Sequence, residues 1–111
     1  METGFNYTEP ANVQPVRIEQ VFAEKPGGGV VANPDTDLPP TTPVAFDTDT
    51  ETYKPIAATD TTTKPDYVTG AWVFAGKGDQ LVRLINGANL RKETAVITAA
   101  QAALIPTINL V

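Results

Sequence analysis

The fold class follows from one stretch of the sequence, TPVAFDTDTETYKPI, which spans residues 42–56. Residues 43–46 carry the branched and aromatic side chains of a short strand. Residues 47–50 alternate Asp with Thr, and both types hydrogen-bond their own backbone in turns. Residues 51–56 are then expected to return as a second strand, which Pro55 either confines to a sheet edge or ends early. The stretch therefore predicts a β-hairpin.

More short strands are predicted after this hairpin. Residues 67–74 (YVTGAWVF) form the most apolar strand candidate and contain the single tryptophan. Trp72 and Phe74 would share one face of this strand, and we expect that face to lie in the core because the chain has few other aromatic side chains to build one. The flanking signals predict a loop at residues 59–64, a turn at 76–79, a strand at 80–85 and a turn at Asn86-Gly87.

The end of the chain predicts one helix and one strand. Thr98 can cap a helix over residues 99–104, which Pro106 would terminate. Residues 107–111 alternate apolar with polar as a final strand, and the apolar Val111 suggests a packed C-terminus. The predicted fold is thus mostly β: a small single domain of short strands, of the β-barrel or β-tulip kind, with one short helix.

The N-terminal third of the chain differs in composition from the rest. Seven of the ten prolines fall within the first 43 residues, and each lacks a backbone donor. We therefore divide the chain into an N-terminal arm, residues 1–34, and a β-rich domain, residues 35–111. Residues 1–15 hold too few large apolar side chains to offset the entropy of ordering them, so the Pro/Gly-rich arm is expected to be flexible.

One segment of the arm still has the pattern of a strand. Residues 16–22 (VRIEQVF) would place Val16, Ile18 and Phe22 on one face, with charged and polar residues between them. Three consecutive glycines, residues 27–29, follow this segment and predict a flexible joint.

Composition excludes several kinds of chemistry. The chain of 111 residues has no Cys, no His and no Ser, so it offers no thiolate, imidazole base or serine nucleophile, and we expect no enzyme activity, cofactor or metal. The net charge of −5 argues against nucleic acid as the main partner. No apolar run reaches the about 20 residues that span a bilayer, and no signal peptide is recognisable, so no membrane partner is expected.

Charge is distributed unevenly along the chain. Residues 35–66 carry seven acidic residues and two lysines, whereas residues 67–111 carry four basic and two acidic residues. Such polarity can orient a module on its partner. Solvated loops that keep a small domain soluble are the commoner explanation.

Three motifs point to ligands, and each has a simpler explanation. Asp47, Asp49 and Glu51 alternate like calcium ligands but lack the glycine and the final acidic residue of an EF-hand loop, so a hairpin tip is favoured. Residues 76–79 (GKGD) contain pieces of a phosphate-binding loop without its full spacing, which favours a turn. Residues 6–8 (NYT) match a glycosylation acceptor with no secretion signal.

Three short segments, together with the order of the parts, carry a resemblance to a known family. They are TPVAFDT at residues 42–48, NGA at residues 86–88 and IPTINLV at residues 105–111. From about residue 41 to residue 111 the chain resembles the lambda-type head decoration proteins of tailed phages, which are small acidic cement proteins of about this length.

The resemblance implies a structural role in the virion. Such proteins bind as homotrimers at three-fold and quasi-three-fold sites on the outer surface of the expanded icosahedral head, after synthesis in the host cytoplasm. Their N-terminal arm pairs with a sheet of the major capsid protein. Carried over to this chain, the resemblance makes the apolar residues of its arm the candidate capsid-binding residues: Phe5, Tyr7, Val13, Val16 and Ile18.

Two other functions fit the same sequence. A β-rich carbohydrate-binding module, or a head-fibre or adhesion module, would expose Trp72 and Tyr67 as stacking surfaces. A minor virion component at the head–tail junction would form a ring in place of a trimer.

Overall fold

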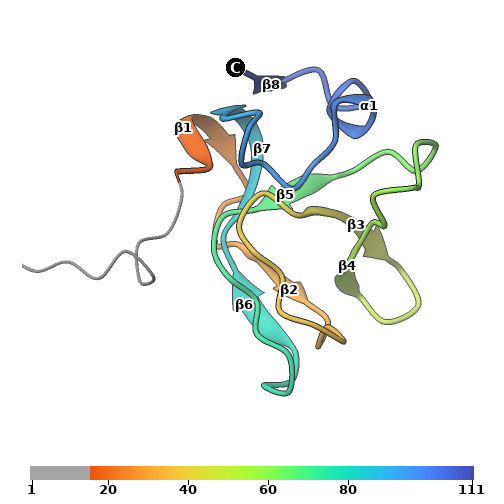
Figure 1. Ribbon diagram of the computed structural model, residues 1–111. Coiled ribbons are helices and arrows are strands. Elements are labelled where there is room, and N and C mark those ends of the chain that lie inside the picture. Colours follow the sequence, from red (N-terminus) through yellow and green to blue (C-terminus); the bar gives the residue numbers. More distant parts are fainter. Residues whose placement is uncertain (1–15) are drawn as a thin grey trace, which may run out of the picture.

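Residues 16–111 of the computed structural model form one curled sheet of eight strands with a single short helix (Figure 1). The elements are β1 (Ile18–Glu24), β2 (Gly29–Val31), β3 (Pro43–Asp47), β4 (Thr52–Pro55), β5 (Tyr67–Thr69), β6 (Gln80–Val82), β7 (Leu84–Leu90), α1 (Ala99–Ala102) and β8 (Ile108–Leu110). The strand order is β1-β7-β5-β3-β4-β2-β6, and β8 pairs with β7 outside this path. The predicted mostly-β class with one short helix is confirmed.

The predicted hairpin is present as β3 and β4. These strands pair antiparallel from Val44↔Pro55 to Asp47↔Thr52. The tip closes through a hydrogen bond from Glu51 N–H to the Asp47 carbonyl at 2.8 Å. Strand β4 ends at Pro55, and its parallel contact with β2 is made at Tyr53, before the proline. Pro55 therefore ends the strand without disturbing the pairing of β4 with its second neighbour.

Residues 16–34, which we had placed in a flexible arm, belong to the sheet. Strand β1 pairs antiparallel with β7, and β2 pairs with both β4 and β6. Only residues 1–15 of the expected arm lie outside the described residues. The sequence could not show this, because both strands pair with partners more than 20 residues away.

The face of β1 also differs from the prediction. Its register against β7 shifts at several points, and the shifts bring Ile18 and Val21 against the core while Phe22 stays exposed. Such irregularities in pairing change which side chains face inward.

Buried apolar side chains form two clusters, one on each half of the sheet. The first lies under α1 and β8 and comprises Val68, Ile85, Ala88, Leu90, Ile97, Ala102, Ile105 and Ile108. The second lies between β2, β3, β4 and β6 and comprises Val31, Val44, Tyr53, Val73, Val82 and Leu84.

The predicted strand over residues 67–74 ends early. β5 stops at Thr69. The next residue, Gly70, still donates to the Arg83 carbonyl at 2.7 Å, and it packs so closely that a Cβ there would lie 3.0 Å from the side chains of Arg83 and Ile85. Beyond it the chain leaves β7, and Val73 forms an isolated bridge with Leu38.

The predicted turn at Asn86-Gly87 is absent, because both residues lie inside β7. A Cβ at Gly87 would lie 3.0 Å from the Cβ of Ala23 on β1. The glycine is therefore explained by the close approach of two strands and not by a turn. The predicted turn at residues 76–79 is confirmed, with Gly76 and Gly78 both at positive φ.

The C-terminal elements are largely as predicted. Thr98 caps α1, and its side chain and that of Gln101 form a reciprocal capping box. The Gln101 amide, which is fully buried, donates to the carbonyls of Ala57 and Asp60 at 2.8 and 3.1 Å, so α1 holds the 59–64 loop in place. Strand β8 pairs parallel with β7, but the side chain of Val111 is exposed and not packed as expected.

Neighbouring glycines allow a controlled test of the packing between β2 and β6. Gly27 and Gly28 both have positive φ, but a Cβ at Gly27 meets open space, whereas one at Gly28 would lie 2.6 Å from the Val82 carbonyl oxygen. We expect Gly27→Ala to cost about 1–2 kcal/mol through its backbone conformation. Gly28→Ala should cost about 1–3 kcal/mol more because of the clash. Urea unfolding measures both, and equal losses would contradict this packing.

The 59–64 loop predicts a pH dependence. Hydrogen bonds from the Thr63 hydroxyl and from the Thr63 and Thr62 N–H groups lower the pKa of Asp60 from 3.8 to about 2. Because the pKa is lower in the folded state, the carboxylate stabilises the fold above about pH 4, and this contribution disappears as the pH falls toward 2. Asp60→Asn should lower Tm at pH 7. The difference in Tm between this variant and the unsubstituted protein should become smaller as the pH falls from 4 to 2.

The control for this measurement is Glu93→Gln, which removes an exposed carboxylate from a different loop. A gap that stays constant down to pH 2, or an equal gap in the control, would show that the Asp60 hydrogen bonds do not stabilise the loop.

Candidate functional site

Only two of the five predicted capsid-binding residues lie in the described part of the chain. Phe5, Tyr7 and Val13 fall outside it. Val16 precedes β1 and is 53% exposed, and its carbonyl accepts a hydrogen bond from the Thr94 hydroxyl. Ile18 is half-buried against the first core cluster. The structure thus leaves Val16 available for contact and uses Ile18 mainly for packing.

Strand β1 is a terminal strand of the sheet. Within residues 16–111 it pairs with β7 alone, so its other edge carries backbone groups without a strand partner. Such an edge is a template on which a further strand can pair. Phe22, 55% exposed, adds an apolar side chain beside this edge.

Two ion pairs hold the ends of β1. Arg91 contacts Glu19 near its start, with Nη2 at 2.5 Å from Oε2. Arg83 contacts Glu24 at its end through Nε and Nη2, at 2.7 and 3.2 Å. The hydrogen bonds from Arg83 hold the pKa of Glu24 below its usual value, so this pair persists at neutral pH. The edge of β1 is therefore held in a fixed position.

A second candidate surface is built by the segment after β5. Val73 exchanges both backbone hydrogen bonds with Leu38 and points into the second core cluster. Alternation along an extended chain then turns Trp72 and Phe74 outward together. The Gln80 side chain fixes this segment, because it accepts from the Phe74 N–H at 3.2 Å and donates to the Phe74 carbonyl at 2.8 Å.

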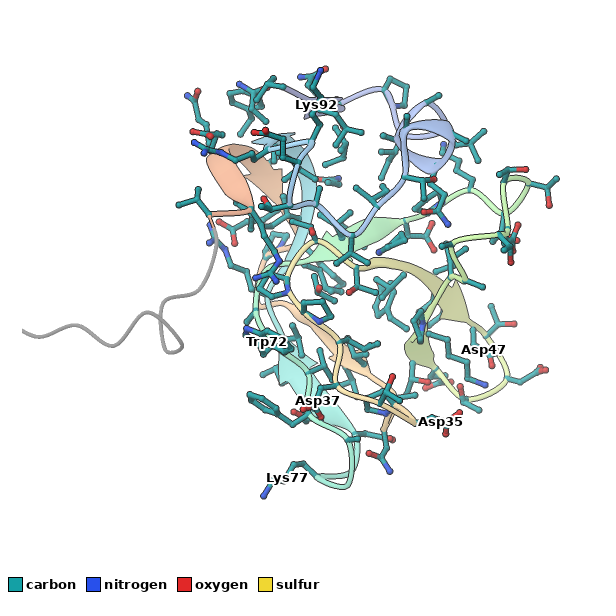
Figure 2. The ribbon with its side chains drawn as sticks, viewed as in Figure 1. Asp35, Asp37, Asp47, Trp72, Lys77 and Lys92 are labelled. Atoms are coloured by element: carbon teal, nitrogen blue, oxygen red, sulfur yellow. The ribbon has the colours of Figure 1, made fainter. Side chains whose placement is uncertain are left out.

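The expectation that Trp72 and Phe74 lie in the core is wrong. Trp72 is half-buried and Phe74 is 46% exposed, and their rings stack with centroids 6.1 Å apart and planes 7° apart. The Arg17 guanidinium lies 5.6 Å from the centroid of the Trp72 ring, within the range of a cation–π contact. Trp72 sits on the outside of the sheet in Figure 2. Val73, which lies between Trp72 and Phe74 in the sequence, is the residue of this segment that packs in the second core cluster.

Two further apolar side chains extend this surface. Val30 on β2 and Leu81 on β6 are cross-strand partners, and their neighbours Val31 and Val82 point into the second core cluster. Val30 and Leu81 therefore point outward with the stacked rings, and Leu81 is 72% exposed. We call these four residues the outer apolar face: Val30, Trp72, Phe74 and Leu81.

No sequence pattern identified Leu81 and Val30 as exposed. Each precedes a buried valine, Val82 or Val31, and because both residues of each pair are apolar, periodicity cannot tell which one faces inward.

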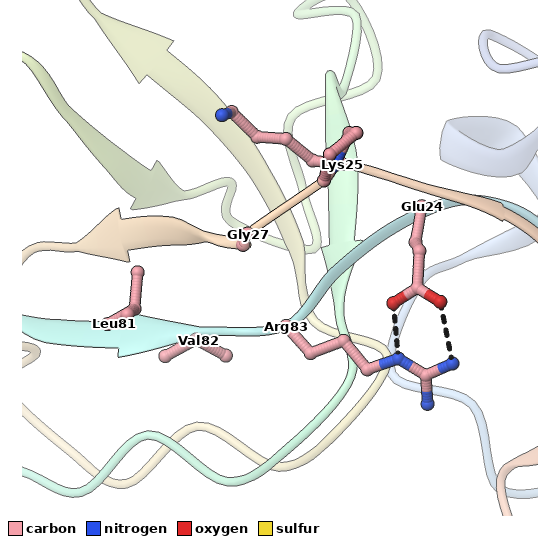
Figure 3. Close-up of a pocket in the computed structure, with 8 residues that line it drawn as sticks. Glu24, Lys25, Gly27, Leu81, Val82 and Arg83 are labelled. Carbon is pink, nitrogen blue, oxygen red and sulfur yellow. Dashed lines mark hydrogen bonds and ion pairs between the residues drawn. The ribbon is translucent and has the colours of Figure 1, made fainter.

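A shallow pocket of about 560 Å³ lies beside Leu81 (Figure 3). It is lined by the turn between β1 and β2 and by β6, with the Glu24–Arg83 pair at one side and Lys25 at another. Both carboxylate oxygens of Glu24 accept hydrogen bonds from the Arg83 guanidinium. The pocket offers an open, mixed-charge surface beside the outer apolar face.

The hairpin tip does not form a calcium site. Lys54 Nζ lies 2.7 Å from one oxygen of Asp47, and the Asp49 N–H donates to the other at 3.0 Å. These contacts lower the pKa of Asp47 and use its oxygens as in an ordinary turn. Residues 16–111 contain no cluster of three or more metal-ligating side chains.

Fluorescence of the single tryptophan tests the placement of the outer apolar face. The half-buried Trp72 should emit at longer wavelength than a fully buried indole and should be quenched by acrylamide. Phe74→Ala should raise the quenching constant, because the stacked ring shields one part of the indole. Phe46→Ala, which removes a similarly exposed ring (44%) from the β3–β4 hairpin, is the matched control and should leave quenching unchanged. Blue-shifted emission that resists quenching would place Trp72 in the core.

Comparison of the chain with family models, with characterised proteins and with solved structures returned no match. No helix among residues 16–111 is long and apolar enough to cross a membrane. The functional argument therefore rests on the two surfaces described above, the edge of β1 and the outer apolar face.

Proposed function

We propose that the chain is a virion structural protein that decorates and stabilises the expanded icosahedral head of a tailed phage. It binds as homotrimers at three-fold and quasi-three-fold sites, and its N-terminal residues pair with the major capsid protein. The observation that carries this proposal is the open edge of β1, which only residues 16 and 17 separate from residues 1–15. The sequence resemblance to lambda-type decoration proteins supplies the class of partner.

Strand pairing at β1 explains how so small a domain could bind a shell. The edge offers backbone donors and acceptors to a strand of the capsid protein, and Val16 and Phe22 offer apolar contacts beside it. The ion pairs at Glu19 and Glu24 keep the edge in place before binding, which reduces the entropy lost on association.

Three linked copies would strengthen a weak contact. Once one copy of a trimer is bound, the others face their own sites at a high effective concentration, so modest contacts sum to tight binding. Such a clamp bridges neighbouring capsid subunits by geometry and needs no catalytic group.

Co-sedimentation with expanded, undecorated heads tests this function. The full chain should saturate at three copies per three-fold site. The variant Phe5→Asp/Tyr7→Asp/Val16→Asp should bind at least about tenfold more weakly, because charges replace the apolar contacts of the pairing segment. Val96→Asp, a similar change at an exposed valine after the 91–94 turn, is the control and should bind normally.

Two outcomes would contradict the proposal in different ways. Failure of the full chain to bind expanded heads would exclude the decorating role. Undiminished binding by the triple variant would keep the role but exclude the N-terminal residues as the anchor.

A carbohydrate-binding or adhesion module is the second candidate, and one observation favours it. The exposed Phe74 and the half-buried Trp72 stack on a segment held in place by Gln80, which gives an aromatic surface of the kind that sugars can bind. Trp72 emission, followed while oligosaccharides are added, would change saturably if this candidate were correct. Tyr67, the other residue considered for such a surface, packs edge-on against Tyr53 at 5.7 Å and faces the second core cluster.

A further inference from the structure

We propose that the outer apolar face docks on the β3–β4 hairpin of a second copy of this chain, so that copies associate head to tail into a closed ring. The inference rests on the proposed function only for the number of copies, three. The contact itself is argued from the charges and exposed side chains of the two surfaces.

The outer apolar face has the properties of a protein interface. Its four side chains come from two paired strands and from the segment bridged to Leu38, and they lie together on the outside of the sheet. Monomeric proteins rarely leave large apolar side chains grouped in this way, and Leu81 is largely exposed. The stacking of Trp72 on Phe74 and the clamp by Gln80 also fix the surface before binding.

Three cations that form no ion pair within the described part of the chain lie near this face. Arg17 lies over Trp72, Lys77 is on the following turn, and Lys25 lines the pocket beside Leu81. None of the three forms an ion pair with another residue in the 16–111 range.

The nearby acidic side chains only partly offset these cations. Glu24 is paired with Arg83, whereas Asp37 accepts from the Ala75 N–H at 2.8 Å and Asp79 from the Asn33 N–H at 2.9 Å, and both of these keep their negative charge. Three cations therefore lie near the outer apolar face against two charged carboxylates, and its rim carries a small excess of positive charge.

The β3–β4 hairpin presents the complementary surface. Phe46 is exposed and rests edge-on against Tyr53, with ring centroids 5.1 Å apart. Asp49 and Glu51 at the tip are exposed, and neither forms an ion pair with another residue that the structure describes. An apolar ring bordered by two carboxylates without an ion pair among the described residues complements an apolar face whose rim carries an excess of cations.

The positions of the two surfaces determine the symmetry. Figure 2 shows Trp72 and Asp47, which marks the hairpin, on opposite sides of the molecule. One copy can therefore use both surfaces at once, which makes the contact heterologous and produces a ring when the rotation closes. A two-fold contact of the outer apolar face with itself would bring like charges together and is disfavoured.

The absence of cysteine makes a direct test possible, since any disulfide must involve an introduced residue. Leu81→Cys places a thiol in the outer apolar face, and Thr48→Cys places one at the exposed hairpin tip without removing an acidic residue. Under mild oxidation, a mixture of the two single variants should form cross-linked dimers. The Leu81→Cys/Thr48→Cys variant should form a covalent trimer on a non-reducing gel.

Each single variant alone should stay unlinked. Efficient cross-linking of Leu81→Cys with itself would overturn the proposal in favour of a two-fold contact. The absence of cross-links in the mixture and in the double variant would overturn it altogether.

Charge reversal gives an independent readout by sedimentation velocity. Lys77→Glu and Asp49→Lys should each raise the protein concentration at half-assembly, by at least about fivefold, and a mixture of the two should restore association at the altered interface. Lys64→Glu, the same charge change in the 59–64 loop, is the control and should leave assembly unchanged. Equal effects of Lys64→Glu and Lys77→Glu would show that net charge alone controls association, and would contradict the proposed contact.

Head binding separates this inference from the proposed function. Rings that form and cross-link as expected but do not bind heads would support the inference and refute the decorating role. Heads that bind three copies per site without a Leu81–Thr48 cross-link, in solution or on the head, would support the role and refute this contact.

Discussion

Strand β7 sets the position of much of the molecule, because it pairs with three strands, β1, β5 and β8, and places buried side chains in both core clusters. β1 pairs along one edge, while β5 at its start and β8 at its end share the other. Leu84 reaches the second core cluster, and Ile85, Ala88 and Leu90 reach the first. Gly87 admits the close approach of Ala23, so the location of β1 follows from the absence of one side chain in β7. The edge proposed to meet the capsid protein is therefore fixed from the centre of the sheet.

Local chemistry explains which elements were predictable from sequence. The β3–β4 hairpin and the cap of α1 are each specified within about fifteen residues, by turn residues, a proline and a Thr–Gln pair. The errors arose where distant partners decide. Asn86-Gly87 has the local preference of a turn, but pairing with β1 on one side and packing on the other keep it extended. The strand pattern at residues 16–22 was recognised, but its place in the sheet was not, and β2 was missed altogether, because the stabilising partners of β1 and β2 lie in β4, β6 and β7.

The candidate surfaces were less predictable than the fold for a related reason. Val16 stays a predicted capsid-contact residue: it was chosen because its segment has few other apolar side chains, and its side chain is exposed. Trp72 was assigned to the core because aromatic side chains usually are buried, and sequence does not show that the smaller Val73 occupies that position. The bridge between Val73 and Leu38, two residues 35 positions apart, decides which way the whole segment faces.

Arg17 connects the two surfaces. Its carbonyl accepts a hydrogen bond from the Arg91 N–H at 2.9 Å next to the start of β1, and its guanidinium lies over Trp72 in the outer apolar face. A capsid strand paired along β1 would hold the backbone at residues 16–18 and thereby restrict the guanidinium. A second copy docked on Trp72 would restrict the same side chain from its other end. Ordering such a side chain costs about 0.5–1.5 kcal/mol. The first partner to bind orders Arg17, so the second partner binds without that loss of free energy. The two proposed contacts would therefore favour each other, and assembly between copies and attachment to the head would proceed together.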